Sequence, residues 1–119
     1  MKWLELKEAG QLETIKAESH QQPVLIFKHS TRCSISRAVL DRLERNWSNA
    51  DVSDVKPYFL DLLTYRPLSN QIALDFDVEH ESPQAIIIYR GNPVYVQSHF
   101  GIDLAAIRQA SEKCVATKN

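Results

Sequence analysis

Apolar residues gather in three short runs along the chain, and these runs predict the core strands of a β-sheet. The runs span 24–27, 57–62 and 85–89. They are rich in branched and aromatic residues, which is typical of strands buried on both faces. A weaker alternation over 3–6 predicts a short edge strand, and the turn at 90–93 predicts a hairpin that returns through 94–96.

Apolar residues at helical spacing predict four helices between and after these strands. The clearest pattern follows Cys33 and repeats every four residues through Ile35, Val39, Leu43 and Trp47, with charged residues on the other faces. Weaker patterns predict the other three helices over 8–19, 66–76 and 103–117. The predicted order of elements is therefore β-α-β-α-β-α-β-β-α.

This order predicts an α/β fold in which a central mixed β-sheet is flanked by helices on both faces. The 119 residues fit a single domain, 1–119, with a polar loop at 49–54. The first strands are expected to pair in parallel through right-handed crossovers, and the hairpin adds an antiparallel pair. The reactive surface of such a sheet lies beyond the carboxyl ends of its central strands. The segment that leaves the 24–27 strand at this edge leads to Cys33.

Composition narrows the class of protein. Hydrophobic residues make up 44% and charged residues 24%, which are the proportions of a globular domain. The formal net charge of -1 favours neither nucleic acid nor an anionic membrane as a partner. No apolar run approaches the roughly 20 residues that span a bilayer. The N-terminal residues alternate with charges, so we expect no apolar segment of a secretory signal peptide there. Two cysteines are too few for a disulfide scaffold. We therefore expect a cytoplasmic monomer.

Cys33 stands at the start of the clearest helix, directly after the polar turn 29–32. A thiol there faces unpaired backbone N–H groups and the positive end of the helix dipole, and both favour the reactive thiolate. The cations Lys28, Arg32 and Arg37 add to this effect. Most cysteines outside disulfides are small buried packing residues. The polar residues around Cys33 favour the reactive alternative.

Ser36 follows Cys33 by three residues, where a dithiol oxidoreductase carries its second cysteine. The motif is therefore C-x-x-S. A single thiolate attacks a mixed disulfide and keeps one half as an adduct, which a second small thiol must release. The motif predicts exchange with a low-molecular-weight thiol, with Cys33 and Ser36 as catalytic residues. The Ser36 hydroxyl either donates a hydrogen bond to the thiolate or is an ordinary helix hydroxyl.

Three segments carry a resemblance to a known family. They are Phe-Lys-His-Ser-Thr-Arg-Cys-Ser-Ile-Ser at 27–36, Arg-Pro-Leu-Ser-Asn at 66–70 and His-Glu-Ser-Pro-Gln at 80–84. In order and spacing they resemble the YtxJ-like monothiol bacilliredoxins. The resemblance implies a thioredoxin-like fold and action on mixed disulfides between proteins and bacillithiol, a cysteinyl glucosaminyl-malate thiol of some bacteria. One departure is Ser34, because the family commonly has Cys-Pro-Ile-Ser at this place.

The resemblance also implies roles for residues outside the helix start. Pro83 is expected to be cis, and the backbone of Ser82 to pair with the substrate. The malyl carboxylates of bacillithiol would lie near Cys33, where Lys28, Arg32 and Arg66 are either their partners or solvated surface charges. From their place at the start of the predicted 66–76 helix, Tyr65 and Arg66 are expected to line the substrate groove. Bacillithiol is then a co-substrate, the partners are S-bacillithiolated proteins, and no cofactor or metal is bound.

Several alternatives stay open. Glutathione or coenzyme A would undergo the same exchange, and other C-x-x-S proteins bridge an iron–sulfur cluster between two subunits. A non-catalytic thioredoxin-like adaptor is a third class. His29 and His80 with Cys33 make a poor zinc site, because structural zinc needs four ligands in tight pairs. Cys114 shares a helical face with Ile107, so it is expected to fill the core rather than to act as a resolving thiol.

Overall fold

The computed structural model describes residues 2–47 and 54–117, with side chains as far as Cys114. Five strands form one mixed sheet in the order β1-β3-β2-β4-β5. The strands are β1 (Leu4–Glu5), β2 (Val24–His29), β3 (Lys56–Asp61), β4 (Gln84–Tyr89) and β5 (Asn92–Ser98). The helices are α1 (Gly10–Glu18), α2 (Ser34–Trp47), α3 (Arg66–Phe76) and α4 (Leu104–Thr117), with a 3-10 turn, η1 (His99–Gly101), after β5.

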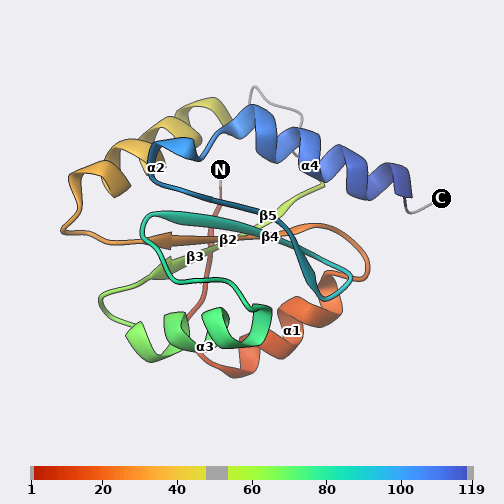
Figure 1. Cartoon of the computed structure of the whole chain (residues 1–119), viewed down its shortest axis with the longest axis horizontal. Coiled ribbons are helices and arrows are strands. Elements are labelled where there is room, and N and C mark those ends of the chain that lie inside the picture. The colour runs from red at the N-terminus through yellow and green to blue at the C-terminus, as the bar shows by residue number, and fades with distance from the viewer. Residues whose placement is uncertain (1, 48–53, 118–119) are drawn as a thin grey trace.

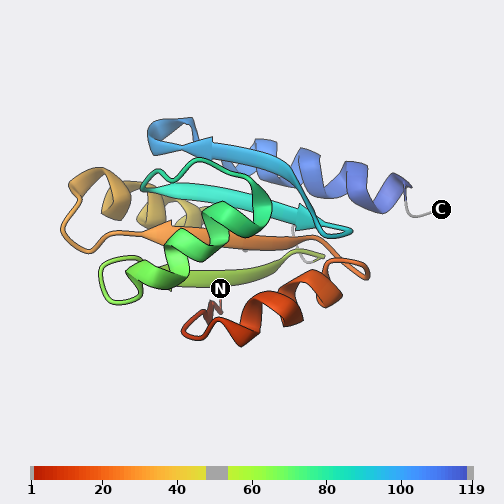
Figure 2. The same ribbon diagram turned by 60° about the horizontal axis from the view of Figure 1, so that its bottom comes forward.

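The helices cover the sheet in two pairs. Figure 1 shows α2 and α4 on one face of the sheet and α1 and α3 on the other. The rotated view in Figure 2 shows α3 crossing in front of the strands, with α1 below it. The predicted α/β class and the order of elements are confirmed.

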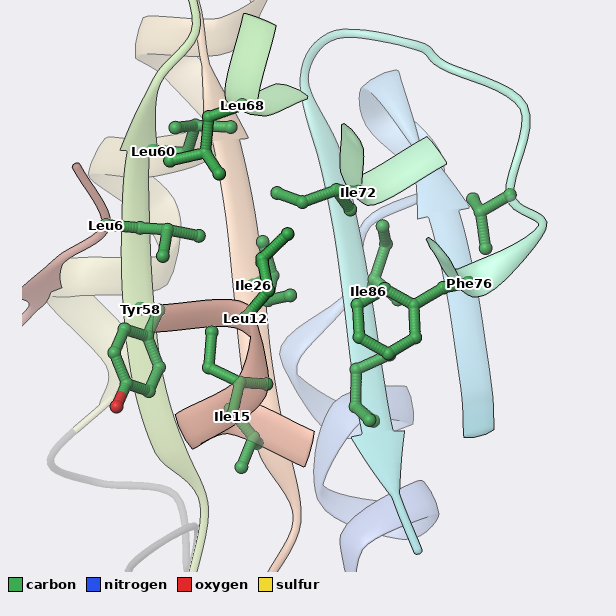
Figure 3. Close-up of a cluster of buried hydrophobic side chains, with 13 residues drawn as sticks. Leu6, Leu12, Ile15, Ile26, Tyr58, Leu60, Leu68, Ile72, Phe76 and Ile86 are labelled. Carbon is green, nitrogen blue, oxygen red and sulfur yellow. The ribbon is translucent and has the colours of Figure 1, made fainter. Parts of the chain in front are cut away.

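Each face of the sheet has its own hydrophobic core. On one face, Leu12 and Ile15 of α1 and Ile72 of α3 pack against Ile26 and Ile86 of the sheet (Figure 3). On the other face, Val39 and Leu43 of α2 and Ile107 of α4 pack against Phe27 and Ile87. Because side chains alternate along a strand, β2 and β4 supply both cores, and all twelve of their residues are buried.

Strand directions bring distant segments to one edge of the sheet. Strand β2 runs parallel to β3 and antiparallel to β4, and Lys28 pairs with Leu60 on one side and Gln84 on the other. The end of β2, the end of β3 and the start of β4 therefore meet at a single edge. The chain leaves β2 there and turns into α2. This edge carries Cys33.

Several boundaries differ from the predictions by a few residues. Strand β2 continues through Lys28 and His29, and β5 begins at Asn92, inside the predicted turn. Helix α2 begins at Ser34, one residue after Cys33. Residues 49–53 of the predicted loop lie outside the described part. In the part of the chain that the structure describes, no helix has the length and apolar character to cross a bilayer.

Candidate active site

Cys33 occupies the N-cap position of α2. Its carbonyl accepts the N–H of Arg37 at 3.1 Å, which is the first hydrogen bond of the helix, and its own N–H donates to the Ser30 carbonyl at 3.1 Å. An N-cap side chain lies beside the unpaired N–H groups of the first helical turn. The thiol is partly exposed. The predicted placement of Cys33 at a helix N-terminus is thus confirmed.

Ser36 is wholly buried, and its hydroxyl has two partners. It lies 2.7 Å from Nδ1 of His29 and accepts the N–H of Ser30 at 3.1 Å. Among the described residues no hydrogen bond joins this hydroxyl to the Cys33 thiol, so of the two alternatives for Ser36 the donor to the thiol is not found. The hydroxyl instead ties the helix to the end of β2 and closes the turn that carries Cys33.

The loop before β4 lies at the same edge. The Ser82–Pro83 peptide bond is cis, as the resemblance implied, and the Pro83 carbonyl accepts the N–H of His99 at 2.9 Å. The Ser82 hydroxyl is buried and has no hydrogen-bond partner in the described residues. Gln84 follows directly and pairs with Lys28 of β2. The Ser82–Pro83 segment is thereby fixed at the sheet edge that leads to Cys33.

Lys28 is fully buried, which corrects its expected place in the substrate groove. Its ammonium group donates to the Ser69 carbonyl at 3.2 Å and to Nδ1 of His80 at 3.3 Å. Burial lowers the pKa of Lys28 from 10.5 to about 8. The side chain points toward α3, on the opposite face of β2 from His29, so a carboxylate at the surface does not reach it.

Arg32 and Arg66 are exposed cations at this edge. Arg32 directly precedes Cys33, and Arg66 is the first residue of α3, which starts near the end of β3. Tyr65, expected to line the groove, packs partly buried against the core beneath α1 and α3. Of the cations predicted to meet a substrate carboxylate, these two arginines are accessible.

Comparison with known proteins identifies the family. The model of the monothiol bacilliredoxin BrxC family matches residues 4–107. The chain belongs to this family. Among solved structures, the chain resembles a protein described as a candidate oxidoreductase with a thioredoxin fold. The two are 30% identical, with a TM-score of 0.76, over 90% of this chain and 91% of the other. The fold of this bacilliredoxin is therefore thioredoxin-like.

More distant structures share the fold alone. Thioredoxin from Fasciola hepatica is 15% identical, with a TM-score of 0.69 over 92% of this chain and 97% of its own. Chloroplastic thioredoxin z is 20% identical, with a TM-score of 0.71 over 98% and 96%. Both comparisons support the thioredoxin-like fold that the resemblance in the sequence implied.

The two histidines of the bacilliredoxin site lie on opposite faces of β2. His29 contacts Ser36, and its ring is tilted against that of Phe59 with 5.4 Å between the ring centroids, whereas His80 contacts Lys28. Burial lowers the pKa of both imidazoles. In residues 2–47 and 54–117, no three histidine, cysteine or acidic side chains gather as metal ligands would. Cys33, His29 and His80 are thus not gathered as a set of metal ligands among these residues.

Cys114 lies at the other end of the bacilliredoxin fold. It is 5% exposed and lines a cavity of about 370 Å³ with Tyr89 at the end of β4 and Val94 of β5. Burial raises the pKa of its thiol. Because β4 starts at the Cys33 edge, its end marks the opposite edge of the sheet. The prediction that Cys114 is a buried packing residue is confirmed.

The sequence analysis missed one member of the site. Ser69 accepts a hydrogen bond from Lys28 through its carbonyl, and its hydroxyl lies 3.2 Å from Nδ1 of His80. Ser69 belongs to the 66–70 segment that carries the family resemblance, which was the available signal. Together with Cys33 and the Ser82–Pro83 loop, the site presents one accessible thiol that is suited to thiol–disulfide exchange.

Proposed function

We propose that this protein is a monothiol thiol–disulfide oxidoreductase that removes bacillithiol from protein mixed disulfides. The observation that carries the proposal is the single thiol of Cys33 at the N-cap of α2, with the buried Ser36 hydroxyl where a second thiol would stand. Cys114 is buried at the opposite edge of the sheet, so it is not placed to resolve an adduct on Cys33. A chain built this way depends on a second small thiol to complete its cycle.

The proposed cycle has two exchange steps. The Cys33 thiolate attacks the bacillithiol sulfur of the mixed disulfide, a new S–S bond forms to Cys33, and the protein thiolate leaves and takes a proton from water. The thiolate of a second bacillithiol then attacks the bacillithiol sulfur of this adduct. Bacillithiol disulfide leaves, and the Cys33 thiolate is restored. The target protein is reduced, and two bacillithiol units are oxidised to the disulfide.

Two arginines support recognition of the small thiol. Arg32 and Arg66 are exposed at the Cys33 edge, and a guanidinium group matches the geometry of a carboxylate. The malyl group of bacillithiol supplies two such carboxylates. In this proposal bacillithiol is a co-substrate and no cofactor is bound. Free bacillithiol is a thiol of the cell interior, so we place the reaction in the cytoplasm, with the protein as a monomer.

The decisive experiment is intact mass spectrometry of the reduced protein after mixing with a bacillithiolated model protein. We expect one bacillithiol adduct on the wild type and on Cys114→Ala, no adduct on Cys33→Ala, and loss of the adduct when bacillithiol is added. Absence of an adduct on the wild type would overturn the proposal. An adduct from glutathionylated or coenzyme A-modified protein, formed faster than from the bacillithiolated one, would instead assign a different small thiol.

A further inference from the structure

The buried ammonium group of Lys28 has an unusual set of partners. They are the Ser69 carbonyl at 3.2 Å and Nδ1 of His80 at 3.3 Å, and no carboxylate in the described ranges forms an ion pair with it. The Ser69 hydroxyl also lies 3.2 Å from the same ring nitrogen. A fully buried lysine is costly unless it is satisfied by hydrogen bonds. The position of the His80 ring is therefore tied to that of Lys28.

This contact decides which nitrogen of His80 carries the proton. An ammonium group donates hydrogen bonds and accepts none. Nδ1 of His80 must therefore present its lone pair to Lys28, and the ring proton must sit on Nε2. Burial, Lys28 and Arg66 lower the pKa of His80, while Glu81 raises it less. At neutral pH the ring is a neutral imidazole with its tautomer fixed.

The same contact decides which way the Nε2–H points. Lys28 and Ser69, on the Nδ1 side of the ring, are both fully buried, whereas His80 itself is partly exposed. The two nitrogens of an imidazole point in diverging directions, so Nε2 lies on the exposed side. His80 belongs to the loop that enters β4 through Ser82–Pro83, at the sheet edge of Cys33. Arg66 begins α3 at this edge.

We propose that His80, oriented by Lys28, donates its Nε2–H to a carboxylate on the small-thiol half of the mixed disulfide. This inference rests on the proposed function and names the chemical group by which the site selects its small thiol. Lys28 is a positioning residue that acts through His80, and Arg66 supplies the charge that draws the carboxylate to the same place. The site thus favours thiols that carry carboxylates over neutral ones.

Two amide variants of His80 provide a matched test. The amide nitrogen of glutamine reaches the place of Nε2, whereas that of asparagine reaches only the place of Nδ1. The readout is the rate constant for adduct formation on Cys33, measured with the disulfide of mercaptosuccinate, which carries carboxylates, and with neutral 2-hydroxyethyl disulfide. Wild type and His80→Gln should prefer the charged disulfide. His80→Asn should lose about tenfold of this preference, through a slower reaction with the charged disulfide.

Lys28→Met tests the orientation of the ring separately. Without the ammonium group only the Ser69 hydroxyl faces Nδ1, and a hydroxyl either donates or accepts, so the tautomer is no longer fixed. The preference should therefore fall while reaction with the neutral disulfide persists. Equal preference in wild type, His80→Gln and His80→Asn would overturn the inference, and so would an equal loss of rate with both disulfides, which indicates a purely structural role. Thermal unfolding of each variant confirms that it is folded.

The two small disulfides contain no bacillithiol, so this test can fail while the test of the proposed function succeeds, and the reverse. If the wild type removes bacillithiol but shows no preference for the charged disulfide, the role of His80 is wrong and the function stands. If the wild type removes no bacillithiol but the preference depends on His80 as described, the carboxylate site stands and the small thiol is a different one.

Discussion

The hydroxyl of Ser36 holds the active-site turn together from the inside. It contacts Nδ1 of His29 and the N–H of Ser30, and all three groups are shielded from water to a large degree. We predict that Ser36→Ala lowers the free energy of unfolding by about 1–3 kcal/mol, because two polar groups lose their partner. Urea unfolding measures the loss. Ser34→Ala, an exposed serine of the same helical turn, is the control and should change little.

Replacing Ser36 by cysteine should change the kind of chemistry. The N-cap residue of a helix and the third helical residue face each other, so Cys33 and a thiol at position 36 would be neighbours. We predict that Ser36→Cys expels a bacillithiol adduct from Cys33 and forms an internal disulfide. Intact mass would show the disulfide in place of the adduct. A long-lived adduct in this variant would contradict the assignment of Ser36 to the resolving position.

The buried Lys28 should make stability depend on pH. Its folded pKa of about 8 lies below the unfolded value of about 10.4, so between these values the unfolded chain binds more protons. The cost of burying the charge is fully present below pH 8 and fades as the pH rises. Relative to Lys28→Met, we predict that the wild type gains about 2 kcal/mol of stability between pH 7 and pH 9.5, measured by urea unfolding.

The comparison with Lys28→Met is needed because a second buried group, the Cys114 thiol, also makes stability depend on pH. Burial raises the pKa of the Cys114 thiol, so its ionisation in the unfolded chain lowers stability as the pH rises. That contribution is common to both proteins and cancels in their difference. A difference that stays constant across this pH range would show that Lys28 is not buried as a charge.

At the scale of single elements, β2 shows what a local pattern can and cannot predict. The apolar run correctly indicates a buried strand, but the strand ends at His29 and not at Phe27. Lys28 and His29 are buried because their partners, Ser69, His80 and Ser36, come from other elements. Hydrophobic periodicity records the nature of a residue and not its distant partners. The expectation that Lys28 meets a substrate carboxylate came from the family resemblance, and it failed because these buried partners lie far away in the sequence.

Helix α2 buries the apolar positions that the four-residue spacing predicted, and its packing allows a prediction of the free energy of unfolding. Leu43 is 1% exposed and packs in the core beneath α2 and α4. We predict that Leu43→Ala costs about 2–5 kcal/mol of unfolding free energy, through lost burial and the cavity left behind. Leu74→Ala on α3 is the matched control, because Leu74 is 77% exposed and should change stability by less than about 0.5 kcal/mol. Chemical denaturation of both variants checks this.

At the scale of the whole molecule, the order of elements and the position of Cys33 followed from the sequence. Alternating strand and helix patterns, with right-handed crossovers, leave few ways to build the sheet. The antiparallel pairing of β2 with β4 sets the Ser82–Pro83 loop at the Cys33 edge, and no local pattern records which strands become neighbours. The cis state of Pro83 came from the family resemblance alone, because a proline before a strand is usually trans.

The two borders of the sheet have a consequence for the behaviour of concentrated solutions. A border strand exposes backbone groups that invite a second molecule to continue the sheet. Here one border is β1, with only two residues, and the other is β5, which carries Pro93 and pairs with β4 through a register shift. A proline offers no N–H, and an irregular strand makes a poor template. Aggregation by pairing of edge strands between molecules is therefore disfavoured, even at high protein concentration.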